Sequence, residues 1–459
     1  MLWQYVANWH TINGLISYTL GDTERASVKF QDAIDGDSKN LYANYYLGQL
    51  YFESGDFSKA IPYLKRVVQL APVHHRAHSL LASLYTAQVD FERALQSVHQ
   101  ALKLQPGLPQ YHQQLGLIYK QQGQYQQAIE AFQQAVISGG KDKDLFYNFG
   151  YAFVQLGQHD MAIEQFNKGL SDNPEDDELH LELARSYRVL LQPATSIREY
   201  QKAASLNEKN FFAYYELAAL YKHENKLDEA NEYLQQALRI DPDYADIPAS
   251  LFSLGISFKD LGQRDKAIAL LLQALELNSG NAEYHFQLGM LQQELGQYSQ
   301  ALSTLRNAQQ HGFSGEDLRF NQANALINLD RYKEARQLLQ ELIIDVPDHS
   351  YAHAALARIY MSEGNRQSAI KEFEIDIKLS PGNFFSHYDL GLLLKESGDW
   401  MQAKQQLQIA YQLDPEYPYT CGVLLKVYIL LGQSQFALDH SCMDPSGISR
   451  VKVLPGITK

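Results

Sequence analysis

Small and apolar residues recur along this chain with a period of 34 residues, over most of its length. Within one period, apolar residues follow a spacing of about 3.6 in two successive stretches, which is typical of two amphipathic helices. In the block 109–142, Leu115 and Tyr119 mark the first helix, and Ala128 and Phe132 mark the second. The pattern therefore predicts one helical hairpin per block.

Two positions of the period carry small residues almost throughout. The blocks begin at residues 7, 41, 75, 109, 143, 177, 211, 248, 282, 316, 350 and 384. The eighth position is glycine or alanine in all of them, and the twentieth is alanine everywhere except at Ser196. We expect the two helices of a hairpin to touch there, because only a small side chain lets their backbones approach. The chain is predicted to be an all-α solenoid of antiparallel hairpins.

Glycine and proline mark the predicted ends of the helices. A turn glycine, which can adopt a left-handed backbone, ends the first helix at Gly21, Gly55, Gly123, Gly157, Gly262, Gly296, Gly364, Gly398 and Gly432. A proline follows the second helix at Pro72, Pro106, Pro174, Pro242, Pro347, Pro381 and Pro415. The block at 177 lacks the glycine and reads Leu191-Gln192-Pro193 instead. Asp376 stands where the second helix usually has a small buried residue.

One interval is 37 residues long, because three extra residues precede Pro248. They lengthen either a turn, with a bend between two half-solenoids, or the preceding helix. We therefore predict repeats one to seven at 7–244, and repeats eight to twelve with a degenerate thirteenth at 248–440. A non-repeat tail at 441–459 is either a disordered end or the start of a further domain. Apolar residues before residue 7 leave the N-terminal end without a polar cap, so we expect it to self-associate or to continue a longer protein.

These hairpins resemble the tetratricopeptide repeat in the Leu-Gly or Leu-Ala pair, the tyrosine that follows it, the turn glycine, the Ala-x-x-x-Phe of the second helix and the closing proline. The resemblance covers roughly residues 7–440. It implies a right-handed superhelix whose first helices line an inner groove. It also implies a scaffold, since most members hold peptides, helices or proteins in that groove.

Composition and charge limit the classes of partner and the cell compartment that the sequence allows. The net charge of −14 argues against nucleic acid, because phosphate binding requires a basic stripe. No apolar run reaches about 18 residues, so no membrane span is expected. The first residues lack the basic region of a signal peptide, and we expect a cytoplasmic protein. Two cysteines are too few for a disulfide framework, so free thiols are expected.

The resemblance places positions 2, 5, 9 and 12 of each first helix in the groove. Aromatic residues gather at positions 2 and 5, including Tyr351 and Phe385, and cations gather at positions 9 and 12, including Arg358. The candidate partner-binding residues are Tyr147, Arg185, Arg188, Tyr215, Lys222, Phe252, Lys259, Phe286 and Phe320. An aromatic floor with a basic edge suits a peptide or helix with an acidic segment. Alternatively, the aromatics pack between neighbouring helices and the cations pair with nearby acids.

Seven histidines occupy position 4 of their blocks: His10, His78, His112, His180, His285, His353 and His387. Successive first helices lie about 10 Å apart, too far for one zinc ion with ligand distances of about 2 Å. We therefore expect these histidines to pack at the edge of the core. His74, His75 and His78 have ligand-like spacing but no cysteine or carboxylate beside them.

Neither a phosphate-binding loop nor a known catalytic or metal-binding motif occurs in the sequence, so no cofactor, metal or catalytic residue is predicted. The expected function is a non-catalytic scaffold for protein–protein interaction. The alternative is the substrate-targeting region of a larger enzyme, because similar repeats precede the catalytic domains of O-linked N-acetylglucosamine transferases and some bacterial sulfotransferases. Those transferases carry a ladder of groove asparagines, and only Asn148 and Asn321 match it here.

Overall fold

The computed structural model describes residues 2–433, with side chains from residue 6 onward. Within this range the chain forms 25 α-helices and no strand, which confirms the all-α solenoid of antiparallel hairpins. The chain divides into two compact units, Met1–Pro242 and Asp243–Lys459. The tail at 441–459 and the second helix of the thirteenth hairpin lie outside the described residues.

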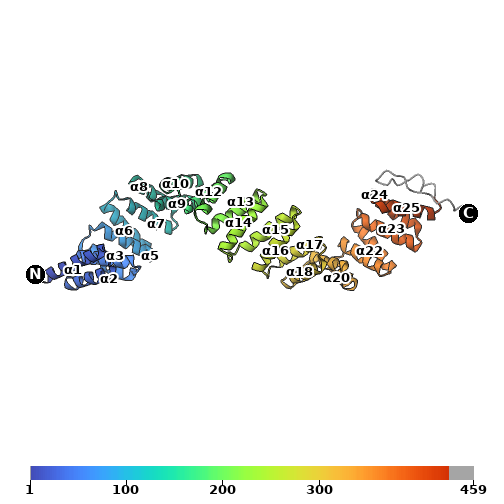
Figure 1. Ribbon diagram of the computed structural model, residues 1–459, viewed down its shortest axis with the longest axis horizontal. Coiled ribbons are helices and arrows are strands. Elements are labelled where there is room, and N and C mark those ends of the chain that lie inside the picture. Colours follow the sequence, from blue (N-terminus) through green and yellow to red (C-terminus); the bar gives the residue numbers. More distant parts are fainter. Residues whose placement is uncertain (1, 434–459) are drawn as a thin grey trace. The chain divides into compact units, whose positions relative to one another are not determined.

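Fourteen helices build the first unit as successive hairpins (Figure 1). They are α1 (Leu2–Thr19), α2 (Thr23–Gly36), α3 (Leu41–Glu53), α4 (Phe57–Leu70), α5 (His75–Ala87), α6 (Phe91–Leu104), α7 (Pro109–Gln121), α8 (Tyr125–Ile137), α9 (Lys143–Gln155), α10 (His159–Asp172), α11 (Asp177–Val189), α12 (Pro193–Leu206), α13 (Phe211–His223) and α14 (Leu227–Ile240).

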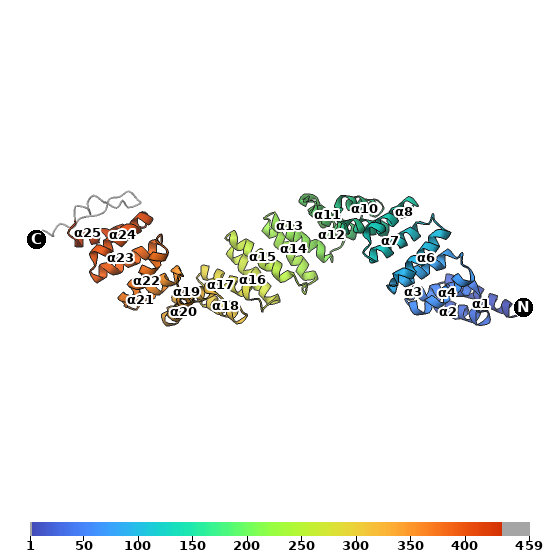
Figure 2. The same ribbon diagram turned by 180° about the vertical axis from the view of Figure 1, so that it is seen from behind.

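Eleven helices build the described part of the second unit, where the same hairpin recurs (Figure 2). They are α15 (Ile247–Asp260), α16 (Arg264–Leu277), α17 (Ala282–Glu294), α18 (Tyr298–Gln310), α19 (Glu316–Asn328), α20 (Tyr332–Asp345), α21 (Ser350–Ser362), α22 (Arg366–Leu379), α23 (Phe384–Ser397), α24 (Trp400–Leu413) and α25 (Pro418–Leu430).

The small residue at position eight lies where the two helices of a hairpin meet. A Cβ added to Gly116 of α7 would stand 2.5 Å from the ring of Phe132 in α8, which is closer than carbon atoms can approach. Gly391 of α23 faces Leu407 of α24 in the same way, at 2.6 Å. The close approach of the two helices therefore explains why the period carries a small residue at this position.

The turn after each first helix has a left-handed backbone whether or not it contains glycine. All nine predicted turn glycines have φ values between 70° and 85°. Where glycine is missing, Val89, Leu191, Asn225 and Asp330 take its place with φ between 55° and 61°. The turn conformation is thus a property of the hairpin, and two of the described blocks impose it on side chains that disfavour it, Val89 and Leu191.

Of the three extra residues before Pro248, two lengthen the connection after α14 and one extends the start of α15. Helix α14 has 14 residues, as α16 has, so the alternative of a longer second helix is wrong. Pro248 lies in the first turn of α15, where a missing N–H costs nothing. Cys421 of α25 is disulfide-bonded, so the expectation of a free thiol is wrong there, and Cys442 lies outside the described residues.

Candidate functional site

Three first helices of the second unit, α19, α21 and α23, line a hollow of about 220 Å³. Aromatic rings, small side chains and amides surround it: Phe320, Asn324, Ile327, Tyr351, Ala354, Ala355, Arg358, Asn383 and Phe385. Most of these residues occupy positions 2, 5, 9 and 12 of their blocks, the stripe that the family resemblance assigns to the groove. Tyr351 and Phe385 are 69% and 51% exposed, so their rings are accessible to a partner.

Arg358 is the cation at the edge of this hollow. Its guanidinium lies 5.6 Å from the ring centroid of Phe385, and its Nε donates a hydrogen bond to Asp389 Oδ2 over 2.9 Å. Burial raises the pKa of Asp389, and the neighbouring Arg358 opposes that rise. The terminal nitrogens of Arg358 make no hydrogen bond within residues 2–433, so they can donate to a carboxylate on a ligand.

A buried carboxylate below the groove joins two of the helices that line it. Asp376 of α22 is fully buried and accepts hydrogen bonds from the Ser350 hydroxyl and, over 2.8 Å, from the Asn383 side-chain amide. Ser350 begins α21 next to Tyr351, and Asn383 directly precedes α23. Asp376, for which the sequence offered no reason, therefore ties together the starts of the two helices that carry the exposed rings.

The candidates in the first unit are engaged with neighbouring residues. Arg185 Nη1 donates to Glu182 Oε1 over 2.7 Å, and its guanidinium lies 5.2 Å from the ring centroid of Phe212. Arg188 Nε lies 3.6 Å from Glu216 Oε2. Burial raises the pKa of the half-buried Tyr147.

Tyr215 and Lys222 both lie on α13 and are also half-buried, with the ring of Tyr215 stacked on Phe211 at 5.6 Å. Since Lys222 likewise has contacts, none of the candidates in the first unit stands apart from its neighbours.

The candidates in the second unit differ in exposure. Phe252 is half-buried and stacks on Tyr284, with 4.5 Å between ring centroids. Phe286 is only 6% exposed and stacks on Phe313 inside a core cluster, so it offers little surface to a partner. Phe320 lines the hollow described above, where it brings α19 and α21 together through its contact with Tyr351.

Several position-12 side chains reach the next repeat. Lys120 Nζ donates to Asn148 Oδ1 over 2.6 Å, and Lys259 Nζ donates to Gln287 Oε1 over 3.3 Å. The acceptors stand at position 6 of the following block, 28 residues later in each case. The predicted basic edge is thus partly used to connect neighbouring first helices.

The position-4 histidines have a structural task that the sequence did not reveal. In six of them, Nε2 faces the backbone carbonyl six residues earlier, at 2.8–3.1 Å, in the linker that precedes the helix. His353 also bonds through Nδ1 to Glu372 at 2.6 Å, and this contact raises its pKa against the opposing effect of burial. Among the three histidines with ligand-like spacing, His75 is hydrogen-bonded to the Tyr111 hydroxyl and His78 to the Pro72 carbonyl. Both rings therefore already have protein partners.

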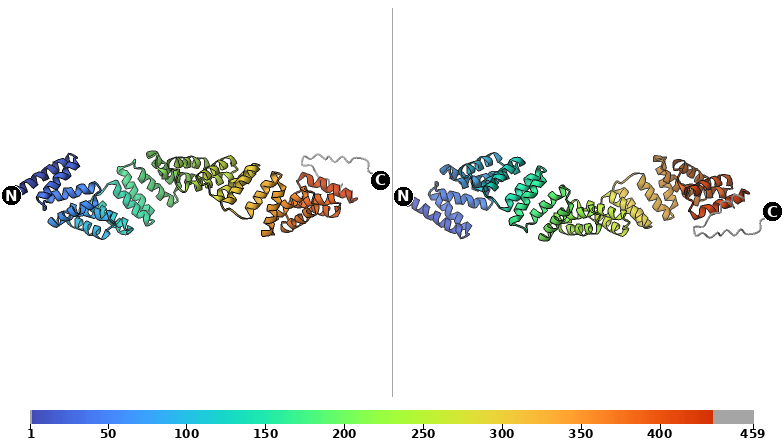
Figure 3. Two further views of the ribbon diagram at one scale, coloured as in Figure 1. Left: turned by 90° about the horizontal axis from the view of Figure 1, so that it is seen from below. Right: turned by 90° about the horizontal axis from the view of Figure 1, so that it is seen from above.

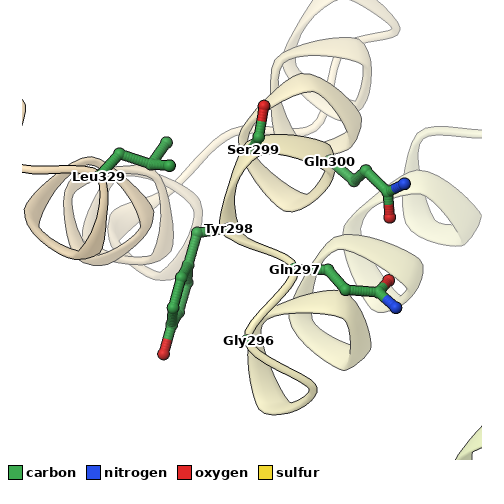
Figure 4. A pocket seen from close by; sticks show the side chains of 6 residues that line it. All are labelled: Gly296, Gln297, Tyr298, Ser299, Gln300 and Leu329. Atoms are coloured by element: carbon green, nitrogen blue, oxygen red, sulfur yellow. The ribbon is translucent and has the colours of Figure 1, made fainter.

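A second hollow lies at the turn between α17 and α18 (Figure 4). Its lining residues are Gly296, Gln297, Tyr298, Ser299, Gln300 and Leu329, none of which carries a charge. In Figure 4 the Tyr298 ring lies on the Leu329 side of the turn, and the side chains of Gln297 and Gln300 lie on the other side. This hollow therefore offers no charged side chain to a ligand.

Sequence reasoning named the exposed rings and Arg358 as groove residues, and its set of candidate partner-binding residues, Tyr147 to Phe320, shares Phe320 with the hollow. It missed Asn324, Ile327, Ala354, Ala355 and Asn383. The consecutive alanines at 354 and 355 are the signal that could have found the hollow, because small residues on a groove-facing stripe leave space between larger ones.

Family models described as tetratricopeptide repeat match residues 18–84, 52–118, 315–359 and 326–378, and others match 114–178, 211–280 and 270–303. Together they cover 18–178, 211–303 and 315–378, well over half of the chain. No curated protein sequence matches it. No helix within residues 2–433 combines the length and apolar character needed to cross a membrane.

Solved structures of similar fold include the C-terminal part of a TPR repeat-containing protein from Cytophaga hutchinsonii, with 16% identity, coverage of 52% of this chain and 97% of that one, and a TM-score of 0.47. PilF of Pseudomonas aeruginosa has 22% identity, coverage of 44% and 92%, and a TM-score of 0.40. A chain of the APC/C hetero-tetramer Cut9–Hcn1 has 14% identity, coverage of 92% and 96%, and a TM-score of 0.36. At such low identities and TM-scores, nothing about function is carried over from these structures.

Proposed function

The chain belongs to the tetratricopeptide repeat family, and from this premise we propose that it is a non-catalytic scaffold that binds a partner peptide or helix in the groove of its second unit. The observation that carries the proposal is the hollow between α19, α21 and α23, with two accessible rings beside it. Tyrosine and phenylalanine offer a large contact area at low entropic cost, which suits the recognition of an apolar side chain.

The partner segment is proposed to combine an apolar anchor with a neighbouring carboxylate. The anchor fits between Phe320 and the two alanines, and the carboxylate accepts hydrogen bonds from the terminal nitrogens of Arg358. Because Asp389 already neutralises part of the Arg358 charge, a single carboxylate suits the site better than a run of acids.

The first unit supports a second contact region around Arg185 and Phe212. The two side chains repeat the arrangement of Arg358 and Phe385, with a position-9 arginine over a position-2 ring of the next repeat. Six other residues named from the sequence stay candidates for contacts with a longer partner: Tyr147, Arg188, Tyr215, Lys222, Phe252 and Lys259.

Capture from the lysate of the source cell, read by mass spectrometry, tests the proposal. The bait is the full chain, compared with a Tyr351→Ala/Phe385→Ala variant. The matched control is Tyr42→Ala, because Tyr42 occupies the same repeat position as Tyr351 in the first unit and is 63% exposed. We expect one protein to be lost with the double variant and kept with the control.

A synthetic peptide from the captured protein then gives the affinity by calorimetry. We expect the Tyr351→Ala/Phe385→Ala variant to bind it at least about tenfold more weakly, a difference of about 1.4 kcal/mol. Replacing the acidic residue of the peptide by its amide should weaken binding to the wild type but not to Arg358→Gln. Equal binding by all variants would remove the groove of the second unit from the proposal.

The remaining expectations have their own tests. Cell fractionation checks the cytoplasmic location. The reading frame around the gene checks whether the chain is the targeting region of a larger enzyme, which requires a catalytic domain encoded in the same frame.

A further inference from the structure

Helix α1 presents an apolar face to solvent at the N-terminal end of the first unit, where Figure 1 shows it beside α2 and α3. Figure 3 shows the same N-terminal end, in blue, from two further sides. Four residues of this face, together with Leu20 directly after the helix, form what we call the α1 stripe: Val6, Trp9, Ile12, Ile16 and Leu20. They are between 44% and 79% exposed, and they follow one another at intervals of three or four residues. Such intervals place them on a single side of a helix.

The corresponding face is buried in the later repeats, against the second helix of the preceding repeat. In α3, Ala43 and Leu50 hold positions 3 and 10 and pack with Phe30 and Ala33 of α2 in one cluster. The same two positions hold Ala352 and Ile359 in α21, which are 0% and 1% exposed.

In α1 these two positions are held by Trp9 and Ile16, which are 59% and 51% exposed. The α1 stripe therefore corresponds to the face through which each later repeat packs against the preceding one. Among the described residues, no repeat packs against the α1 stripe itself.

The α1 stripe is complementary to itself. When two copies of α1 lie antiparallel about an axis between residues 12 and 13, Trp9 of one copy lies opposite Ile16 of the other. The two Ile12 side chains then lie beside each other near the axis, and Val6 lies within one residue of the position opposite Leu20. Each apolar contact away from the axis thus occurs twice, as an isologous interface with a two-fold axis requires. The stripe spans about 21 Å at 1.5 Å per residue, which is enough for four turns of contact.

The absence of charged residues from α1 favours a second copy over a charged partner or a membrane surface. Helix α1 contains no aspartate, glutamate, lysine or arginine, although the chain as a whole carries a net charge of −14. A charged partner would find no countercharge on this helix. A helix that lies on a membrane usually carries lysine and arginine on its polar face, and α1 has neither.

We propose that two copies of this chain associate through the α1 stripe as an antiparallel, two-fold symmetric pair. This association is separate from partner binding in the groove, because α1 lies in the first unit and the hollow lies in the second. One pair of helices buries less than about 1,200 Å² in total, at the low end of specific interfaces, so we expect a dissociation constant in the micromolar range.

Sedimentation velocity of the full chain, from about 1 to 100 µM, tests the association. The wild type should shift from monomer to dimer over this range, and Trp9→Glu/Ile16→Glu should stay monomeric. The matched control is Val28→Glu, because Val28 lies on α2 outside the stripe and is 53% exposed. It should dimerise as the wild type does. All three substitutions are on exposed side chains, and circular dichroism verifies that each variant keeps its helix content.

A cross-linking experiment tests the antiparallel register. In a chain with its two native cysteines replaced by serine, Ile12→Cys should form a covalent dimer on mild oxidation, because the two copies of residue 12 lie beside each other near the axis. Leu20→Cys should not, because residue 20 lies near Val6 of the other copy.

Three results would overturn the proposal. The first is a wild type that stays monomeric up to 100 µM, and the second is a dimer that survives the two glutamates. The third is a monomeric wild type that floats with lipid vesicles through the stripe, which would assign this face to a membrane surface.

Discussion

The groove faces of the two units place an arginine over an aromatic ring in the same repeat positions, yet they leave different space beside it. In the first unit, Arg185 lies over Phe212, and positions 5 and 6 of its helix are Leu181 and Glu182. Both are buried, and Glu182 binds Arg185.

In the second unit, Arg358 lies over Phe385, and positions 5 and 6 of its helix are Ala354 and Ala355. The missing side-chain volume is part of the hollow that opens beside Tyr351. Because Arg358 donates through Nε to Asp389 of α23 instead of binding an acid on its own helix, its terminal nitrogens are left for a ligand. The side chains at positions 5 and 6 therefore decide whether the groove is filled, with the arginine bound to an acid of its own helix, or leaves a hollow beside an accessible arginine.

The largest expected effect on stability comes from overpacking the core of the first unit. In the first unit, Gly150→Leu forces a large side chain against the ring of Phe166, and we expect a loss of about 3 kcal/mol in the free energy of unfolding. Hydrogen exchange should report faster exchange in α9 and α10, with α19 to α23 unchanged. Urea unfolding that matches the wild type would mean that the assigned repeat phase is wrong.

The second change removes the carboxylate beneath the groove of the second unit. Asp376→Ala leaves Ser350 and Asn383 without their buried acceptor, which should cost about 2 kcal/mol of stability. Peptide binding should weaken as well, because the starts of α21 and α23 lose their common anchor. Ser171→Ala, at an exposed hydroxyl of α10 in the first unit, serves as the control and should leave both measurements unchanged.

The third change gives the second unit the residue types that the first unit has at positions 5 and 6 of α11. Ala354→Leu/Ala355→Glu fills the hollow and gives Arg358 an acid three residues before it, as Glu182 does for Arg185. We expect the partner peptide to bind at least about tenfold more weakly, with circular dichroism unchanged. Undiminished binding would separate the partner site from the hollow.

A smaller effect comes from the turns that lack glycine. Val89 has a φ of 61° and a β-branched side chain, so Val89→Gly should stabilise the first unit by about 1 kcal/mol in urea unfolding. Asp330 in the second unit has a φ of 57°, and Asp330→Gly should change little, because aspartate tolerates this backbone better. A destabilised Val89→Gly variant would contradict the strain assigned to this turn.

The smallest expected effect is a pH dependence of the second unit through His353. Its pKa is raised above the ordinary value of 6.5 by the hydrogen bond to Glu372. The contribution of His353 to stability is therefore complete below pH 6.5 and declines as the pH rises through the higher pKa of the folded state. Urea unfolding at pH 6 and pH 8 should differ more for the wild type than for His353→Asn.

The sequence was sufficient for the hairpins, since helical spacing, turn glycines and linker prolines are signals within one repeat. It also named Phe320, Tyr351 and Phe385, all of which line the hollow. It did not anticipate the role of the position-4 histidines or that of Asp376, because both depend on contacts between a side chain and a linker or helix elsewhere in the repeat stack.

Local chemistry therefore decided the helices, their ends and their phase, because those features depend on residues a few positions apart. Only the packed structure decided which groove residues stay accessible. Phe286 and Phe320 share repeat position 5, yet the first is buried against Phe313 and the second lines the hollow. The accessibility of a side chain at one repeat position depends on the volumes of the side chains that neighbouring repeats pack against it. The sequence pattern of a single repeat carries no information about those neighbours.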